Sequence, residues 1–322
     1  MKRILVTGAA GQIGTELVPA LLARYEGGTV IATDIKEPVE PLPAGARFEP
    51  LDCTDGDACR RVVSDHGVDT IYHLAAILSA KAEGMPQRAW EVNSNGLYHV
   101  LEAAREAGCA VFTPSSIAAF GGGTPADPAP QDTIQRPGTI YGVTKVAGEL
   151  LCDYYHARFG VDTRGLRYPG LISYVAPPGG GTTDYAIEIF HAALIEGRYT
   201  CYLQPDTQLD MMYMPDALRA AVELMDADAD RLRHRNAFNV TAMQLTPARL
   251  ADAIRVHLPD FEIGYAVDPT RQRIATSWPR RIDDGAARRE WDWRPEYDMP
   301  AMVEDMLARL APRLGVTSPV GA

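Results

Sequence analysis

A tyrosine and a lysine stand four residues apart near the middle of the chain, in the segment Tyr141-Gly-Val-Thr-Lys145. On a helix, residues at positions i and i+4 share one face and lie within reach of each other. An ammonium group beside a phenol favours the phenolate and lowers the phenol's pKa from its usual value of about 10. The pair could therefore act as a general base toward an alcohol, or as a general acid toward a ketone. Because this spacing also occurs by chance in many helices, other residues must support the assignment.

Two serines, Ser115 and Ser116, follow a candidate strand at residues 110–114. In doubly wound sheets, ligands bind beyond the carboxyl ends of the strands. A hydroxyl group at that place can orient a substrate oxygen, although serine pairs are usually turn formers. The combination of these serines with Tyr141 and Lys145 favours a catalytic site.

Three glycines, Gly8, Gly11 and Gly14, follow the first candidate strand and open a candidate helix that also contains Gln12 and Ile13. Glycines in this position allow a tight turn, close approach of the backbone to a pyrophosphate, and close packing of helix on strand, while the helix N-terminus supplies N–H donors. The spacing is G-x-x-G-x-x-G and not the more familiar G-x-G-x-x-G, but the strand–glycine–helix context is the required one. The segment predicts a dinucleotide site.

Two acidic residues follow later strands. Asp34 stands 20 residues after Gly14, where a carboxylate accepts hydrogen bonds from the ribose hydroxyls of NAD and repels the 2′-phosphate of NADP. The alternative is a solvated loop acid or a partner for Lys36. Asp52 could bind the edge of the adenine, or could simply close a turn. We expect NAD as the cofactor.

The first half of the chain alternates short β-branched runs with longer amphipathic segments. Expected strands lie at Arg3–Thr7, Thr29–Thr33, Thr70–Leu74 and Ala110–Pro114, and expected helices at Gln12–Tyr25, Asp55–His66 and Asn93–Ala107. Buried strands that alternate with helices predict an α/β fold of the Rossmann type, with a doubly wound parallel sheet. Four later segments are expected to be helical or strand-like: a helix at Ala186–Glu196, a strand at 208–214, a helix at Pro215–Met225 and a last helix near Met299–Leu310.

After residue 168 the composition changes to a segment rich in glycine and proline, PGLISYVAPPGGGTTDY, which is long enough to be a functional loop. We therefore expect two parts, with approximate boundaries. Residues 1–168 and 203–240 would form the NAD-binding Rossmann domain, and residues 169–202 and 241–322 a smaller substrate-binding lobe.

Composition excludes several other classes of protein. The 31 Lys and Arg residues against 42 Asp and Glu give a net charge of −11, which repels nucleic acids and anionic membranes. The five cysteines are scattered and odd in number, as in a reduced cytoplasmic protein, and no Cys/His set of zinc-ligand spacing is present. No apolar run approaches the ~18 residues of a membrane span. We expect a cytoplasmic, metal-independent protein.

Several segments together resemble the extended short-chain dehydrogenase/reductase family. They are TGAAGQIG at 7–14, HLAA at 73–76, the helix that begins at Asn93, SSIAAFG at 115–121, YGVTK at 141–145, and the tail WDWRPEYDMPAMVEDML. The resemblance implies that Tyr141 is the acid–base group, that Lys145 lowers its pKa and holds the nicotinamide ribose, and that Ser116 polarises the substrate oxygen. Asn93 would support the lysine, and further residues would line the cofactor: Leu74, Ala75, Ala76 and Leu171.

The substrate class rests on other positions. Many members that act on nucleotide sugars carry an arginine where this chain has Leu209, and a leucine cannot neutralise a pyrophosphate. By contrast, PGLIS…PPGGGTTDYAIEIF, DMMYMPDALRA and SWPRRIDD are similar to the short-chain type of L-threonine 3-dehydrogenases. This resemblance implies oxidation of the L-threonine 3-hydroxyl to 2-amino-3-oxobutyrate by NAD, in threonine breakdown toward glycine. A nucleotide-sugar epimerase or reductase, and an NAD-sensing regulator without turnover, are the rival interpretations.

An amino-acid substrate requires polar groups for its charged ends. Thr182, Thr183 and Asp184 follow three glycines, so the loop at 177–184 could present two hydroxyls and a carboxylate, and Ser79 could contact the carboxylate or amine. Threonine and aspartate are equally ordinary N-cap residues, which is the alternative. The resemblance also implies a homodimer through the helices at 93–107 and 141–158.

Overall fold

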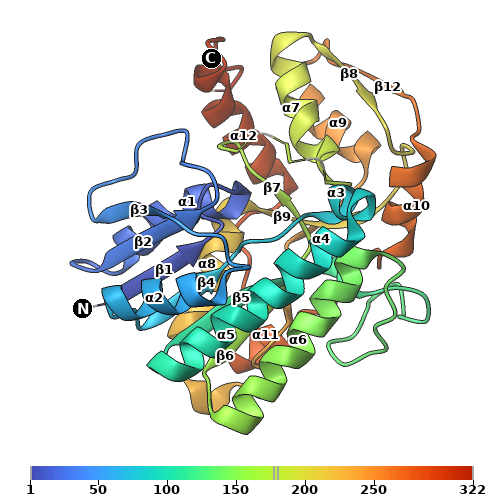
Figure 1. The fold of residues 1–322 in the computed structure, drawn as a ribbon. Coiled ribbons are helices and arrows are strands. Elements are labelled where there is room, and N and C mark those ends of the chain that lie inside the picture. Colours follow the sequence, from blue (N-terminus) through green and yellow to red (C-terminus); the bar gives the residue numbers. More distant parts are fainter. Residues whose placement is uncertain (1, 177, 180, 321–322) are drawn as a thin grey trace.

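The computed structural model describes residues 2–176, 178–179 and 181–320. Its largest element is a seven-stranded sheet with the strand order β10-β6-β5-β4-β1-β2-β3, in which every neighbouring pair is parallel. The expected Rossmann-type α/β fold is confirmed (Figure 1). The strands are β1 (Arg3–Thr7), β2 (Thr29–Asp34), β3 (Ala46–Pro50), β4 (Thr70–His73), β5 (Ala110–Ser116), β6 (Thr163–Tyr168) and β10 (Phe238–Asn239).

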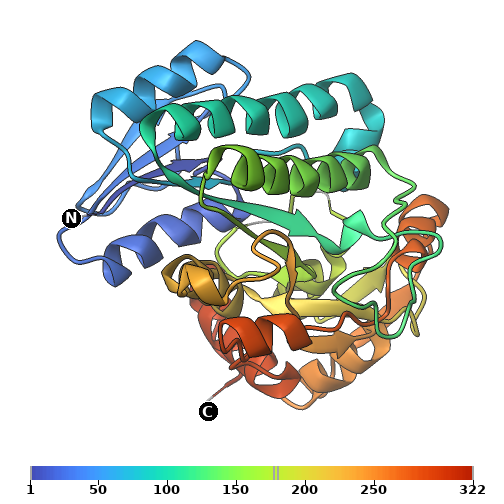
Figure 2. The ribbon, with the colours of Figure 1, turned by 90° about the horizontal axis from the view of Figure 1, so that it is seen from below.

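Helices cover both faces of this sheet, because successive side chains of a buried strand point to opposite faces. Ile4 and Val6 of β1 pack with helices α1 (Gln12–Arg24) and α8 (Met214–Asp226). Leu5 packs on the other face with the second set of helices, which are α2 (Gly56–His66), α5 (Gly96–Ala107) and α6 (Ile140–Phe159). Figure 2 shows α5 and α6 side by side on one face and α1 on the opposite face. The two layers of helices together bury both faces of β1, which is why its residues are almost all apolar.

The predicted elements of the first half occur within a few residues of their expected bounds. The helix expected from residue 93 starts earlier, as α4 (Pro86–Trp90) followed by one π-helical turn at Glu91–Asn95. Strand β6 was not predicted, because its sequence TRGLRY has two arginines. Both are buried, and they bind Asp162 and Glu149 respectively. Arginines with charged partners can be buried in a strand, but they interrupt the apolar run by which a buried strand is recognised in a sequence.

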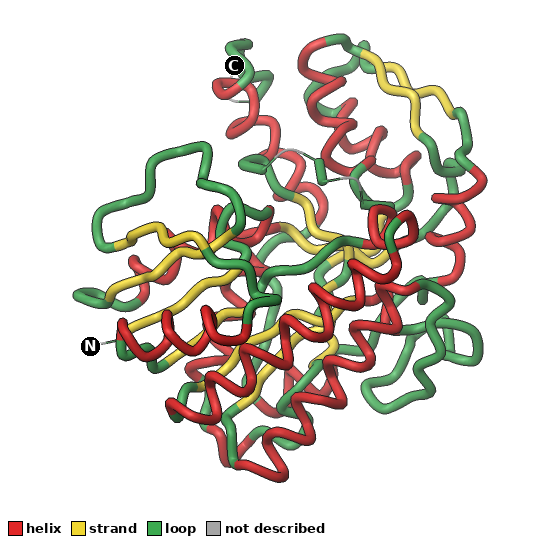
Figure 3. Tube along the Cα trace, in the orientation of Figure 1, coloured by secondary structure: helices red, strands yellow, loops and turns green. Residues whose placement is uncertain are grey.

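A second group of elements packs beyond the carboxyl ends of the large sheet (Figures 1 and 3). It contains a three-stranded sheet in the order β11-β9-β7 and a two-stranded sheet of β12 and β8. Its elements are β7 (Gly170–Ile172), α7 (Tyr185–Ile195), β8 (Arg198–Cys201), β9 (Leu209–Tyr213), β11 (Met243–Leu245), α9 (Pro247–Arg255), β12 (Glu262–Tyr265), α10 (Pro269–Ser277) and α12 (Met299–Arg313). These elements share one apolar core with Ile117, Ala118, Phe120 and Tyr141.

Shorter elements complete the chain: α3 (Ser79–Gly84), the 3₁₀ turns Ile117–Ala119 and Ala229–Arg231, and α11 (Gly285–Glu290). Strand β9, although within residues 203–240, pairs with β7 and β11 and not with the large sheet. The division into two parts at the stated boundaries remains our proposal. None of the helices in the described part of the chain combines the length and the apolar character that crossing a membrane requires.

Candidate active site

The glycine loop joins β1 to α1 in a conformation that only glycine accepts easily. Gly8 has a φ of +70°, and a Cβ atom built on it would lie 2.7 Å from the backbone nitrogen of Ala75. A Cβ on Gly14 would overlap the backbone of Gly8 and Ala9. Gly11 is the N-cap of α1, and no side chain caps this helix end. The N-terminus of α1 can therefore offer its N–H groups to a phosphate.

Asp34 ends strand β2 beside this loop. Its Oδ2 accepts a hydrogen bond of 3.2 Å from the backbone N–H of Ala10, and its Oδ1 accepts one of 3.2 Å from the backbone N–H of Lys36. Its carboxylate is thus fixed at the edge of the phosphate loop. Asp52 instead binds the backbone and hydroxyl of Thr54 at 2.9 and 2.8 Å, and Arg88 at 3.3 Å. Asp52 closes a turn, and its contact with an adenine stays a prediction.

Tyr141 and Lys145 lie on the first turns of α6, which begins at a threonine cap. Thr139 accepts a hydrogen bond of 3.1 Å from the backbone N–H of Gly142. Lys145 Nζ lies 5.4 Å from the centre of the Tyr141 ring and donates to the carbonyl oxygen of Pro114 at 2.7 Å. Pro114 and Ser116 belong to the end of β5, so the helix brings both side chains to the carboxyl end of a central strand. The structure therefore brings Tyr141 and Lys145 to the end of β5, near Ser116, as the sequence predicted.

Burial changes the ionisation of both groups. It raises the pKa of Tyr141 to about 12, although a hydrogen bond from Ser116 acts in the opposite direction. It lowers the pKa of Lys145 to about 8, while the negative charge of Glu149 raises it. In the chain without its cofactor, the loss of water around the buried phenol outweighs the hydrogen bond from Ser116. The lowering of the Tyr141 pKa by Lys145 and a bound cofactor stays a prediction.

One pocket opens beside this pair and collects most of the predicted residues. Those that line it are Gln12, Ile13, Leu74, Ala76, Ser79, Ser116, Tyr141, Lys145, Leu171, Thr182, Thr183 and Asp184. Ser115 and Gly181, which belong to the predicted serine pair and loop, line it too. Sequence reasoning missed other lining residues: Leu78, Pro114, Ile117, Tyr168, Pro169, Gly170 and Trp278. Trp278 comes from the SWPRRIDD segment, far away in the sequence, and only the family resemblance of that segment could have indicated it.

Thr182 and Asp184 reach this pocket from the loop that precedes α7. The Thr182 side chain is buried, and its Oγ1 has no hydrogen-bond partner among the described residues. Asp184 is the N-cap of α7, but its side chain makes no capping bond, and instead Oδ2 accepts one of 2.8 Å from the backbone N–H of Gly181. Pro177 and Gly180 of the predicted loop lie outside the described residues. Both residues therefore form part of the pocket wall, with the carboxylate of Asp184 held by the backbone of its own loop.

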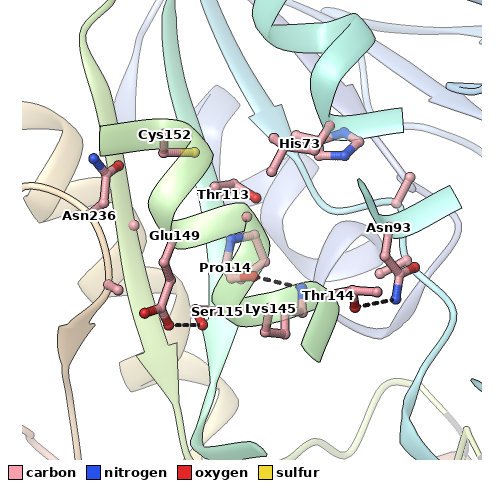
Figure 4. Close-up of a pocket in the computed structure, with 16 residues that line it drawn as sticks. His73, Asn93, Thr113, Pro114, Ser115, Thr144, Lys145, Glu149, Cys152 and Asn236 are labelled. Atoms are coloured by element: carbon pink, nitrogen blue, oxygen red, sulfur yellow. Dashed lines mark hydrogen bonds between the residues drawn. The ribbon is translucent and has the colours of Figure 1, made fainter. Parts of the chain in front are cut away.

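Two more predicted residues, Ala75 and Asn93, line a separate small cavity behind Lys145 (Figure 4). Asn93 is buried and donates to the hydroxyl of Thr144 at 3.1 Å. It also exchanges hydrogen bonds with the backbone of Ile77, with Nδ2 donating at 3.1 Å and Oδ1 accepting at 2.7 Å. Asn93 therefore ties Ile77, which follows the HLAA segment, to the residue that precedes Lys145.

Residues 4–241 match the NAD dependent epimerase/dehydratase family. The chain belongs to this family. An uncharacterized epimerase/dehydratase of Staphylococcus haemolyticus is 52% identical over 308 residues, which cover 95% of this chain and 97% of the relative. The structure of L-threonine dehydrogenase from Clostridium difficile is 54% identical with a TM-score of 0.95, and the match covers 97% of this chain and 98% of that one. A monomeric L-threonine 3-dehydrogenase from a metagenome is 46% identical with a TM-score of 0.92, over 97% and 99% of the two chains.

As a member of this NAD-dependent family, the chain is an oxidoreductase that uses NAD. The residues present fit this cofactor, because the glycines let the loop pack closely between Ala75 and α1 and the N-terminus of α1 is uncapped. Leu209, at the position where the resemblance implies an arginine in members that act on nucleotide sugars, is buried in an apolar core. It presents no charge to a sugar diphosphate.

Proposed function

We propose that this chain oxidises the 3-hydroxyl of L-threonine to a ketone, with NAD as hydride acceptor, and so forms 2-amino-3-oxobutyrate. The proposal is supported by the likeness of nearly the whole chain to proteins described as L-threonine dehydrogenases. The product is a precursor of glycine, which gives the enzyme a place in threonine breakdown. The cytoplasm is the compartment in which we expect it.

A single observation carries the substrate assignment. The pocket that contains the acid–base pair is also lined by Thr182, Thr183 and Asp184, and the buried Thr182 hydroxyl has no partner among the described residues. A buried hydroxyl without a partner has a free-energy cost of about 1–3 kcal/mol, which a substrate's carboxylate or ammonium group can remove. Ser79 lines the same pocket. These groups suit a small zwitterion better than a sugar diphosphate.

The chain's own residues supply the acid–base part of the reaction. Ser116 holds the substrate oxygen, and Tyr141 removes the hydroxyl proton while hydride leaves the same carbon. Lys145 keeps a positive charge beside the phenol and so stabilises the phenolate. When bound, NAD supplies the acceptor for the hydride.

We assign the binding of the cofactor to residues beyond the carboxyl ends of the large sheet. The loop of Gly8, Gly11, Gln12, Ile13 and Gly14 would bind the pyrophosphate, and Asp34 the adenosine ribose. Lys145 would bind the nicotinamide ribose. The nicotinamide end would be lined by Leu74, Ala75, Ala76 and Leu171, with Asn93 behind them.

We also propose a homodimer, in which α5 and α6 of each copy pack against the same helices of the other. The outer faces of α4, α5 and α6 carry exposed apolar side chains, namely Trp90, Tyr98, Val143, Leu150, Tyr154 and Phe159. Apolar patches of this kind usually mark an interface. Because a similar metagenomic protein is described as monomeric, the oligomeric state of this chain has to be measured.

The function is tested by following NADH absorbance with L-threonine, L-allo-threonine, L-serine and a nucleotide sugar as substrates. We expect turnover with L-threonine and none with the nucleotide sugar. Tyr141→Phe should reduce kcat by about three orders of magnitude or more, since the acid–base group is lost, while NAD affinity stays within about threefold. Near-normal activity of this variant, or no turnover of threonine by the wild type, would contradict the proposal.

A further inference from the structure

Helix α1 carries a glutamate that binds a residue of the second group of elements. Glu16 lies on the second turn of α1, and its Oε1 accepts a hydrogen bond of 2.5 Å from the hydroxyl of Ser173. Ser173 is completely buried and directly follows β7. A polar contact therefore joins the helix that opens the predicted phosphate site to the end of a strand that is far away in the sequence.

The hydroxyl of Ser173 uses all of its hydrogen-bonding capacity at this place. It accepts hydrogen bonds from the backbone N–H groups of Val175 and Ala176, at 3.0 and 3.3 Å. A serine hydroxyl has one donor and two acceptor sites, so its single O–H goes to Glu16. If Glu16 were removed, this buried O–H would lose its acceptor, and a buried donor without a partner is costly. The bond therefore fixes the end of β7 relative to α1.

The surroundings of Glu16 allow this bond in both of its protonation states. Burial raises the pKa of Glu16 to about 7, while the Ser173 hydroxyl and the positive charge of Arg313 on α12 act in the opposite direction. The other titratable side chain whose charge is coupled to Glu16 is Tyr213 of β9. A carboxylate and a neutral carboxyl group both have an oxygen that accepts a hydrogen bond. The contact therefore needs an acceptor at this position and not a charge.

The two elements that this bond joins also line the pocket beside Tyr141. Gln12 and Ile13 come from the first turn of α1, and Gly170 and Leu171 come from β7. Strand β7 has three residues and is the edge strand of its sheet, where its neighbour is β9. A short edge strand is held by few backbone hydrogen bonds, so a side-chain contact at its end matters for its position.

We propose that Glu16 is a positioning residue for the cofactor, which acts through Ser173 to keep β7 and Leu171 in place against the first turn of α1. The inference rests on the proposed function, in which that turn binds the pyrophosphate and Leu171 lines the nicotinamide. Glu16 itself is not among the residues that line the pocket. Its role is to set the place of the nicotinamide relative to the pyrophosphate, and so relative to Tyr141.

The binding of two ligands, measured by calorimetry, tests this role without any turnover. ADP-ribose has the adenosine and the pyrophosphate of NAD but no nicotinamide. In Glu16→Ala, we expect the Kd for NAD to rise about tenfold while the Kd for ADP-ribose stays within about twofold, because only the nicotinamide end loses support. Glu16→Gln keeps an acceptor for the Ser173 hydroxyl and should restore the wild-type ratio of the two constants.

Turnover of L-threonine gives a second measure of the same effect. Glu16→Ala should lower kcat about tenfold or more, because a small misplacement of a reacting group slows the reaction strongly. The KM for threonine should stay within about threefold of the wild-type value, because Ser79 and Thr182 are unchanged. If the wild type does not oxidise threonine, the proposed function fails, and the ratio of the two Kd values still decides the inference.

Ser173→Ala removes the other partner of the bond and serves if Glu16→Ala folds poorly. It should show the same selective loss of NAD affinity, and the double variant should resemble Ser173→Ala alone, because both substitutions remove one interaction. A double variant in which the two losses simply add would contradict the proposed link.

Tyr25→Phe is the matched control for a general loss of stability in α1. It removes a hydrogen bond of 2.7 Å from the C-terminal end of this helix to Asp226 of α8 and leaves the contact with β7 intact. This variant should unfold at a lower urea concentration without a change in the ratio of the two Kd values. An equal rise of both constants in Glu16→Ala, the same change of ratio in Tyr25→Phe, or a Glu16→Gln protein no better than Glu16→Ala would overturn the inference.

Discussion

At the scale of single residues, burial sets the ionisation of the catalytic pair in opposite directions. It makes the phenolate of Tyr141 and the ammonium of Lys145 both costly, so the neutral forms gain in the chain alone. Glu149 partly restores the lysine's charge, and a hydrogen bond from Ser116 partly stabilises the phenolate. The positive charge of bound NAD would lower the pKa of Tyr141 and so favour its phenolate when the cofactor is present.

Asp34 is the residue that should select NAD over NADP. Two backbone N–H groups fix its carboxylate beside Ala10, and we propose that this negative charge lies where the 2′-phosphate of NADP would have to bind. Replacing it by serine removes that repulsion, so we expect the ratio of kcat/KM for NAD to that for NADP to fall at least tenfold. Steady-state kinetics with both cofactors measures this ratio. An unchanged ratio would remove Asp34 from the ribose site.

Thr182 allows stability to be separated from substrate binding. Its hydroxyl is buried without a partner among the described residues, so Thr182→Val should leave the free energy of unfolding equal or slightly higher. If the hydroxyl binds the substrate, the KM for threonine should rise roughly tenfold or more while the Kd for NAD stays constant. Thr182→Ser, which keeps the hydroxyl, is the matched control. Equal KM values in the valine and serine variants would argue against substrate contact.

At the scale of elements, charged networks join strands and helices that an apolar pattern cannot reveal. Arg167 of β6 binds Glu149 of α6 at 2.8 Å, and both side chains are buried. The sequence pattern predicted β1, β2, β4 and β5, because these strands are apolar. It missed β6, because its arginines have partners that are distant in sequence. A local pattern of apolar residues predicts which strands are buried. It cannot predict which distant residue pairs with a buried charge and so makes its burial possible.

Glu16 joins helix α1 to the segment after β7 and should make stability depend on pH. Its Oε1 lies 2.5 Å from the Ser173 hydroxyl, and burial raises its pKa from 4.5 to about 7, although Ser173 and Arg313 act in the opposite direction. Because the folded-state pKa lies above the unfolded one, this stabilisation is complete below pH 4.5 and is lost as the pH rises through about 7. The full change amounts to about 3 kcal/mol.

Urea unfolding at pH 5, 6, 7 and 8 checks this expectation. Glu16→Gln should show a flatter dependence than the wild type over this range, and should be the more stable protein at pH 8. Glu196→Gln, which removes an exposed carboxyl at the end of α7, should follow the wild-type curve. Parallel curves for Glu16→Gln and the wild type would show that ionisation of Glu16 is not coupled to unfolding.

At the scale of the whole molecule, the sequence predicted the fold and the region of the site more fully than it predicted the walls of the pocket. Gly8, Tyr141 and Lys145 belong to short segments whose spacing has a physical reason, so they could be found locally. Trp278 and His73 could not be assigned in this way, because their places depend on how distant segments pack. The same holds for the cavity behind Lys145, which five strands and helices enclose together.

The oligomeric state is the last property that belongs to the whole molecule. Leu150 and Tyr154 on α6 are 62% and 54% exposed, and Tyr98 on the neighbouring α5 is 47% exposed. In a twofold dimer through these helices, each substitution acts twice, and Leu150→Glu would bury two unpaired charges. Light scattering after gel filtration should therefore give a dimer for the wild type and a monomer for Leu150→Glu. Ile195→Glu on α7, where the side chain is 61% exposed, is the matched control and should remain dimeric. A monomeric wild type at micromolar concentration, or a Leu150→Glu protein that stays dimeric, would show that these helices do not form the interface.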